Sequence, residues 1–191
     1  MPLESVLLLL DTSEPTRNSD YPPTRLSSQL DCANYLASSV TNGNPESTCG
    51  VMSMGGSAEV LTSLTTNLGS ILGSLHGLPI KGDRSHVPTS LSVALLALKH
   101  RRNKNGGQRV VLFAASKSEC TPKEMTKVGK QLKKNNVTVD VILMVPEDEA
   151  LYGKLCEAAG EGSRVLQVPK GTLPSDVVVA AGVGGGSSSR R

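Results

Sequence analysis

A run near the start of the chain, Ser5 to Leu10 (SVLLLL), constrains the fold more than any other feature. It reads as continuously apolar, which fits a strand buried on both faces of a parallel sheet, because a half-exposed strand would alternate apolar and polar residues. The run ends abruptly in Asp11 to Pro15 (DTSEP). In open α/β sheets ligands bind beyond the carboxyl ends of the strands, so this acidic turn is the first candidate site.

Strand and helix patterns alternate along the rest of the chain. Further strands are expected at Cys49 to Met54, Ala58 to Leu64, Arg109 to Ala114, Val137 to Val145 and Arg164 to Val168. Apolar residues at steps of three and four predict helices at Thr24 to Val40, Asn67 to Leu75, from Thr89 to about Leu98, from Thr121 to about Leu132, Asp148 to Ala159 and Leu173 to Ala181. The glycine-rich turn Gly55-Gly56-Ser57 predicts that the second and third strands form a β-hairpin.

Strands separated by helices require right-handed parallel crossovers, with helices on both faces of the sheet. The order predicts a doubly wound α/β fold with a six-stranded, mostly parallel sheet and one antiparallel hairpin strand. The central strands are expected to be Ser5 to Leu10 and Arg109 to Ala114.

The length of 191 residues is that of one domain, expected over residues 1–181. From Gly182 onward the composition (GVGGGSSSRR) is that of a flexible linker, so residues 182–191 are expected to form a tail. With one Phe, three Tyr and no Trp, the core must be built from aliphatic residues. The shortage of aromatic rings also speaks against base stacking on single-stranded nucleic acid.

The four cysteines are widely spaced and contain no CxxC pair, which favours free thiols in a reducing compartment. The N-terminal apolar run follows Glu4 and is too short for a signal peptide or a membrane span, so a soluble intracellular protein is expected. The net charge of +3 is mild and indicates a solvated surface.

Three loops are expected to converge at the carboxyl edge of the two central strands: Asp11 to Pro15, the segment around Thr89, and Ser116 to Glu119. Asp11, Ser13 and Thr89 would bring a carboxylate and two hydroxyls together there. Hard oxygen ligands of this kind are those that magnesium prefers.

The same residues carry a resemblance to the von Willebrand factor A domains, whose metal-ion-dependent adhesion motif is Asp-x-Ser-x-Ser with a Thr and a second Asp from later loops. Asp11, Ser13 and Thr89 match that motif, whereas Pro15 replaces its second serine and no aspartate follows the Arg109 strand. Lys117 lies where another negative charge would be needed, and a cation there repels a divalent ion. No metal and no other cofactor are therefore expected, and the motif residues are expected to close the loops by hydrogen bonding.

Longer stretches, LDTSEPTRNSDYPPTR, NPESTCGVMSM, EVLTSLT, LALKHR and QLKKNNVTVDVI, are similar to the N-terminal A domain of the multiubiquitin receptors of the 26S proteasome regulatory particle. The resemblance implies a non-enzymatic docking domain that holds its receptor near the junction of lid and base, in cytoplasm and nucleus. It also implies that polyubiquitin binds only through C-terminal helices that this chain lacks. The expected contact surface is the rim that we define by Asp11, Ser13, Glu14, Thr89, Ser116 and Lys117.

Other interpretations remain. One is a metal-dependent ligand-binding A domain, for example of a transcription or repair complex, with magnesium or manganese at Asp11 and Ser13. The basic segment Lys99 to Lys104 could face nucleic acid, but an acidic protein surface fits it better and no membrane partner is expected. An enzyme is distant: the glycines after Ala181 lack the following helix of a dinucleotide site, and Asp11 as a nucleophile would need a second carboxylate.

Overall fold

The computed structural model of the protein describes residues 2–182, so the expected tail lies outside them apart from Gly182. Six strands form a sheet in the order β3-β2-β1-β4-β5-β6. Their bounds are Glu4–Leu10 (β1), Thr48–Ser53 (β2), Glu59–Thr65 (β3), Gly107–Ala114 (β4), Val137–Leu143 (β5) and Arg164–Gln167 (β6). Neighbouring strands are parallel except β2 and β3, which form an antiparallel hairpin with an irregular register. The predicted sheet is thus confirmed.

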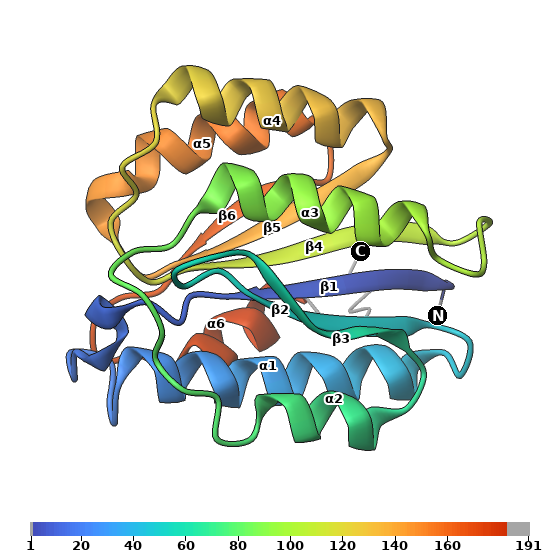
Figure 1. The fold of residues 1–191 in the computed structure, drawn as a ribbon, viewed down its shortest axis with the longest axis horizontal. Helices are drawn as coiled ribbons and strands as arrows, with labels where there is room; N and C mark the ends of the chain where they lie inside the picture. Colours follow the sequence, from blue (N-terminus) through green and yellow to red (C-terminus); the bar gives the residue numbers. More distant parts are fainter. Residues whose placement is uncertain (1, 183–191) are drawn as a thin grey trace.

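The expected central pair is also confirmed, because β1 and β4 lie side by side with Leu7 opposite Val110. From this pair the chain winds outward in both directions, so the order of the strands reverses between them. The loops that follow β1 and β4 therefore meet at the carboxyl edge of the sheet, on the left of Figure 1.

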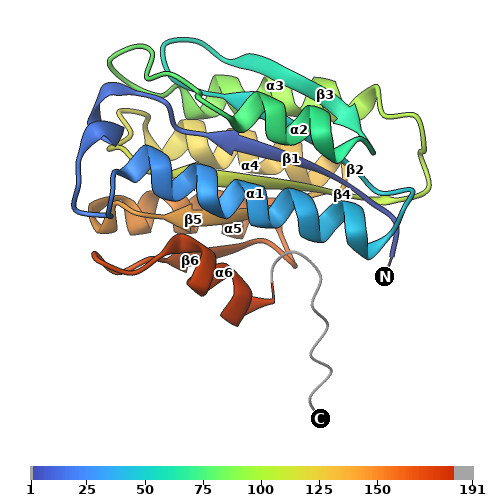
Figure 2. The same ribbon diagram turned by 90° about the horizontal axis from the view of Figure 1, so that it is seen from below.

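Helices cover both faces of the sheet (Figures 1 and 2). Their bounds are Arg25–Gly43 (α1), Leu68–Leu75 (α2), Val87–Lys99 (α3), Pro122–Lys134 (α4), Glu149–Ala159 (α5) and Pro174–Ala181 (α6). The alternate side chains of β1 enter two separate cores. Leu7 and Leu9 pack under α3, α4 and α5, while Val6, Leu8 and Leu10 pack against α1, α2 and α6. The apolar run is therefore buried on both faces, as its composition predicts.

Several element ends differ from the sequence-based expectation by one to three residues; β5, for example, ends at Leu143 rather than Val145. α3 begins at Val87 rather than Thr89, because Pro88 fits the first turn of a helix, where its missing N–H would have no partner. α1 continues past Val40 to Gly43. In the described part of the chain, no helix combines the length and the apolar character needed to cross a bilayer.

Tyr21 fastens the segment between β1 and α1 to the opposite half of the sheet. Its side chain is fully buried, and its hydroxyl donates to the carbonyl oxygens of Val168 at 2.5 Å and Met144 at 3.3 Å. Val168 and Met144 follow β6 and β5, so one phenol joins the segment before α1 to the ends of two strands.

We expect Tyr21→Phe to lower the free energy of unfolding by about 1–2 kcal/mol, because the carbonyl of Val168 would lose its phenolic donor in a buried site. Urea denaturation followed by circular dichroism measures the change. The matched control is Tyr35→Phe on the exposed side of α1, which should stay within about 0.5 kcal/mol of the parent. Equal effects of the two substitutions would contradict this role of Tyr21.

Candidate functional site

Asp11 stands directly after β1 and is 1% exposed. Its Oδ1 accepts hydrogen bonds from the backbone N–H of Ser13 at 3.0 Å, from the Ser13 hydroxyl at 2.6 Å and from the Ser85 hydroxyl. Its Oδ2 accepts from the hydroxyl of Ser116, which follows β4. One buried carboxylate therefore joins three segments that are far apart in the sequence.

The backbone of Asp11 is fixed as firmly as its side chain. Its N–H donates to Oε1 of Gln29 at 2.8 Å, and its carbonyl accepts from Nε2 of the same side chain at 2.9 Å. Gln29 is fully buried on α1, in the apolar face that also carries Leu26 and Ala33. Gln29 was not among the predicted site residues, although an amide at a position where the helical pattern favours an apolar residue is a signal in the sequence.

Ser85 takes the place that was expected for Thr89. Thr89 lies exposed in the first turn of α3 and makes no hydrogen bond to Asp11. Ser85 reaches Asp11 because its backbone pairs with Gly55 in an isolated β-bridge after the β2 strand. The sequence carried no signal for this, since Ser85 lies in a polar loop without periodicity.

Thr12 extends the same arrangement to the hairpin turn. Its hydroxyl accepts from the N–H of Gly55 at 3.1 Å, and its carbonyl accepts from the N–H of Lys81 at 2.8 Å. A Cβ on Gly55 would lie 2.4 Å from the Thr12 hydroxyl and 2.3 Å from the Lys81 carbonyl. Only glycine therefore permits this close approach of the two loops.

The rim residues divide into two sets. Asp11, Ser13 and Ser116 are buried, whereas Glu14, Thr89 and Lys117 are exposed. Ser13 points inward and Glu14 outward, where it pairs with Arg17 at 2.5 Å; this hydrogen bond lowers the pKa of Glu14. Lys117 has no ion-pair partner among residues 2–182. Only the exposed set can touch another molecule, and the buried set can act by holding the loops in place.

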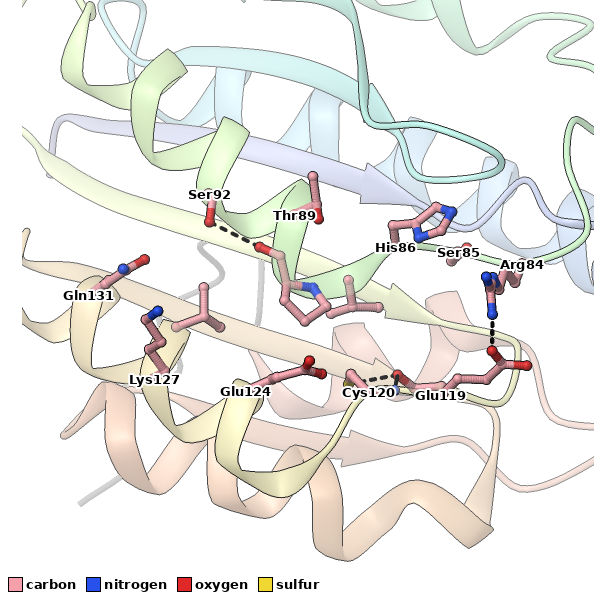
Figure 3. Close-up of a pocket in the computed structure, with 14 residues that line it drawn as sticks. Arg84, Ser85, His86, Thr89, Ser92, Glu119, Cys120, Glu124, Lys127 and Gln131 are labelled. Atoms are coloured by element: carbon pink, nitrogen blue, oxygen red, sulfur yellow. Dashed lines mark hydrogen bonds and ion pairs between the residues drawn. The ribbon is translucent and has the colours of Figure 1, made fainter.

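A pocket of about 480 Å³ lies beside the rim, between the first turns of α3 and α4 (Figure 3). Thr89 and Ser92 line it from α3, and Glu124 and Lys127 line it from α4. An ion pair between Arg84 and Glu119 bridges the loops that precede the two helices. Thr89 therefore belongs to the wall of this pocket rather than to the hydrogen bonds of Asp11.

A second buried carboxylate supports the loop between β4 and α4. Oδ2 of Asp148 accepts from the N–H of Ser118 at 2.7 Å. The hydroxyl of Tyr152 is buried without a hydrogen-bond partner in the described residues, and burial, aided by the charge of Asp148, raises the pKa of Tyr152 far above its usual range. Burial likewise raises the pKa of Cys120, which keeps the thiol protonated at neutral pH.

These groups fit a divalent cation poorly. The inner rim offers one carboxylate, and both of its oxygens already accept hydrogen bonds from hydroxyl or amide donors. No cluster of three or more His, Cys, Asp or Glu side chains in residues 2–182 is arranged to hold a metal. The arrangement suits a structural task, in which donors neutralise the buried charge and lock the loops.

Comparisons with known proteins agree with this geometry. A family model described as the von Willebrand factor type A domain matches residues 6–117. The crystal structure of the SpRpn10 VWA domain matches with a TM-score of 0.86 and 32% identity, covering 99% of this chain and 100% of that one. The chain belongs to the Rpn10 family of von Willebrand factor type A domains. A 26S proteasome regulatory subunit rpn10 of Schizosaccharomyces pombe is 36% identical over 97% of this chain and 78% of its own length.

A plant relative in the Rpn10 family is longer. The 26S proteasome non-ATPase regulatory subunit 4 homolog of Arabidopsis thaliana is 38% identical over 191 aligned residues, which cover 96% of this chain and 49% of the relative. The chain thus spans about half the length of that protein.

We expect Asp11→Asn to lower the free energy of unfolding by about 2 kcal/mol. An amide in place of the carboxylate loses the charge-assisted hydrogen bonds and turns one acceptor into a donor that faces serine hydroxyls. Glu14→Gln, three residues along and exposed, is the matched control and should stay within about 0.5 kcal/mol. Chemical denaturation of the parent and the two variants measures the free energy of unfolding. An Asp11→Asn variant as stable as the parent would contradict the proposed role of the carboxylate.

Proposed function

We propose that this chain is a non-catalytic docking domain that anchors a proteasomal ubiquitin receptor to the regulatory particle. The relatives that support this are named as regulatory subunits of the 26S proteasome. The observation that carries the proposal is the buried Asp11 carboxylate, which holds three loops in one arrangement beneath exposed charged side chains.

Rigidity is what this arrangement contributes to docking. A surface whose loops are already fixed loses little conformational entropy when a partner binds. Glu14 and Lys117 project from the fixed loops with opposite charges, and a partner that presents the complementary pair would gain both orientation and selectivity.

The partners proposed for the rim are lid and base subunits of the regulatory particle. Polyubiquitin would bind through helices outside this chain, as in the receptors that it resembles. A proteasomal role places the protein in the cytoplasm and the nucleus. Neither nucleic acid nor a membrane is part of the proposal.

The chemistry of the rim supports a role without catalysis. Both oxygens of Asp11 are engaged by donors, so neither is free to attack a substrate. The Cys120 thiol in the neighbouring pocket has a raised pKa, the opposite of what a nucleophilic cysteine requires.

Charge reversal at the exposed rim tests the proposal more cleanly than Asp11→Arg, which would also weaken binding but only by disrupting the loops. We expect the double variant Glu14→Lys, Lys117→Glu to bind a regulatory particle that lacks its own Rpn10 subunit about tenfold or more weakly, because both charges meet the wrong sign. Co-sedimentation with purified particles at several salt concentrations measures the affinity.

The control for this test carries the same two charge changes elsewhere. Glu157→Lys with Lys130→Glu alters exposed residues of α5 and α4 outside the rim and should bind as the parent does. Parental affinity of the rim variant would refute docking through this surface. Equal losses in both double variants would refute it too, since the effect would then not depend on the rim.

Titration with a divalent metal tests the alternative function, a metal-dependent ligand-binding A domain. Because the Asp11 oxygens are already engaged, we expect no saturable heat when millimolar magnesium or manganese is titrated into the chain in a calorimeter. A saturable signal that disappears in Asp11→Asn would instead establish a metal-dependent A domain.

A further inference from the structure

A second pocket lies at the pole opposite the rim, on the right of Figure 1, where β1 begins and α3 ends. Its volume is about 730 Å³. Leu3, Val60, Leu64 and Ala97 give it an apolar floor, in which Val60 of the edge strand β3 is 39% exposed. Leu64 and Ala97 are only partly buried against the core beneath α3. This end of the sheet therefore leaves apolar surface open to a partner.

The arginines at this pocket differ from the other arginines of the described chain in their ion pairing. Seven arginines lie within residues 2–182, and five of them pair with a carboxylate: Arg17, Arg25, Arg84, Arg109 and Arg164. The two that do not are Arg101 and Arg102, and both line this pocket. The protein thus neutralises its guanidinium groups everywhere in the described chain except here.

Arg101 is held in place although no carboxylate within residues 2–182 pairs with it. Its Nη1 donates to the Leu98 carbonyl and to Oε1 of Gln108, both at 3.0 Å, and its Nη2 donates to the Lys104 carbonyl at 3.3 Å. These acceptors are neutral, so they fix the guanidinium without cancelling its charge. Arg102 beside it is exposed, and Glu46 is the one carboxylate residue that lines the pocket.

We propose that this pocket docks an acidic segment of a partner protein. Carboxylates of the segment would pair with Arg101 and Arg102, and an apolar side chain between them would enter the floor beside Val60 and Leu64. Charge complementarity favours this occupant, because a carboxylate is the ligand that the five other arginines select within the chain itself.

Nucleic acid fits the same surface less well. No Phe, Tyr or Trp lines the pocket, so His100 is the one ring among the described lining residues on which a base could stack. The open apolar floor offers nothing to a phosphate backbone, whereas it can take an apolar side chain of a protein segment. The pocket is also remote from the rim, so both surfaces could be occupied at once and the inference does not rest on the proposed function.

Fluorescence anisotropy with a labelled synthetic peptide tests the inference. The probe is a run of glutamates interrupted by a central Leu-Leu pair, and we expect saturable binding that weakens as salt is raised. Arg102→Glu should weaken binding about tenfold or more, and Val60→Asp should do the same by placing a carboxylate in the floor. Lys130→Glu on α4 makes the same charge change as Arg102→Glu outside the pocket and should leave affinity within about twofold.

Three further outcomes would overturn the inference. They are an equal loss in Lys130→Glu and Arg102→Glu, equal affinity for a peptide with serines in place of the leucines, and tighter binding of a single-stranded oligonucleotide of equal charge. Absence of saturable binding to the parent chain would overturn it as well. Thermal unfolding shows whether each variant is folded. If Arg102→Glu does not fold, Arg102→Gln replaces it and is also expected to weaken peptide binding.

Discussion

The rest of the site depends on the burial of one negative charge. Asp11 is 1% exposed, and a carboxylate removed from water is stable in the ionised form only when donors surround it. The donors come from Ser13 in its own turn, Ser85 before α3 and Ser116 after β4. These hydrogen bonds fix the relative positions of three loops. The side-chain amide of Gln29 additionally holds the backbone N–H and carbonyl of Asp11.

The same requirement explains how an adhesion-type motif can serve another purpose. In the motif that Asp11 and Ser13 resemble, a metal ion would compensate the negative charge. Here serine hydroxyls donate to the carboxylate directly, so their protons occupy the directions in which an ion would have to approach. The outer surface of the rim is then left to Glu14, Thr89 and Lys117, which are free to contact another molecule.

Charged side chains are paired differently at the two ends of the sheet, the carboxyl ends and the amino ends of its parallel strands. At the carboxyl pole the buried charge is fully satisfied and its function is internal. At the amino ends of the strands Arg109 joins Glu4 at 2.9 Å and Asp140 at 3.3 Å, whereas Arg101 and Arg102 pair with no carboxylate in the described part of the chain. A fixed but uncompensated charge next to open apolar surface is a feature of interaction sites rather than of stable interiors.

Repeating patterns of apolar residues were enough to predict the elements of the fold. The apolar run before Asp11, the helical stripes and the Gly55-Gly56 turn predicted six strands, a hairpin and the adjacency of β1 and β4, because burial imposes a period on each element. The sequence also predicted that Asp11, Ser13 and Ser116 lie close together, because parallel strands end at the same edge of a sheet. Three features became visible only in the folded protein: Ser85 rather than Thr89 contacts Asp11, Gln29 bonds to the backbone of Asp11, and Arg101 pairs with no carboxylate among residues 2–182. These are contacts between loops and helices far apart in sequence, for which no local period exists, so they are defined only when the packed sheet brings the segments together.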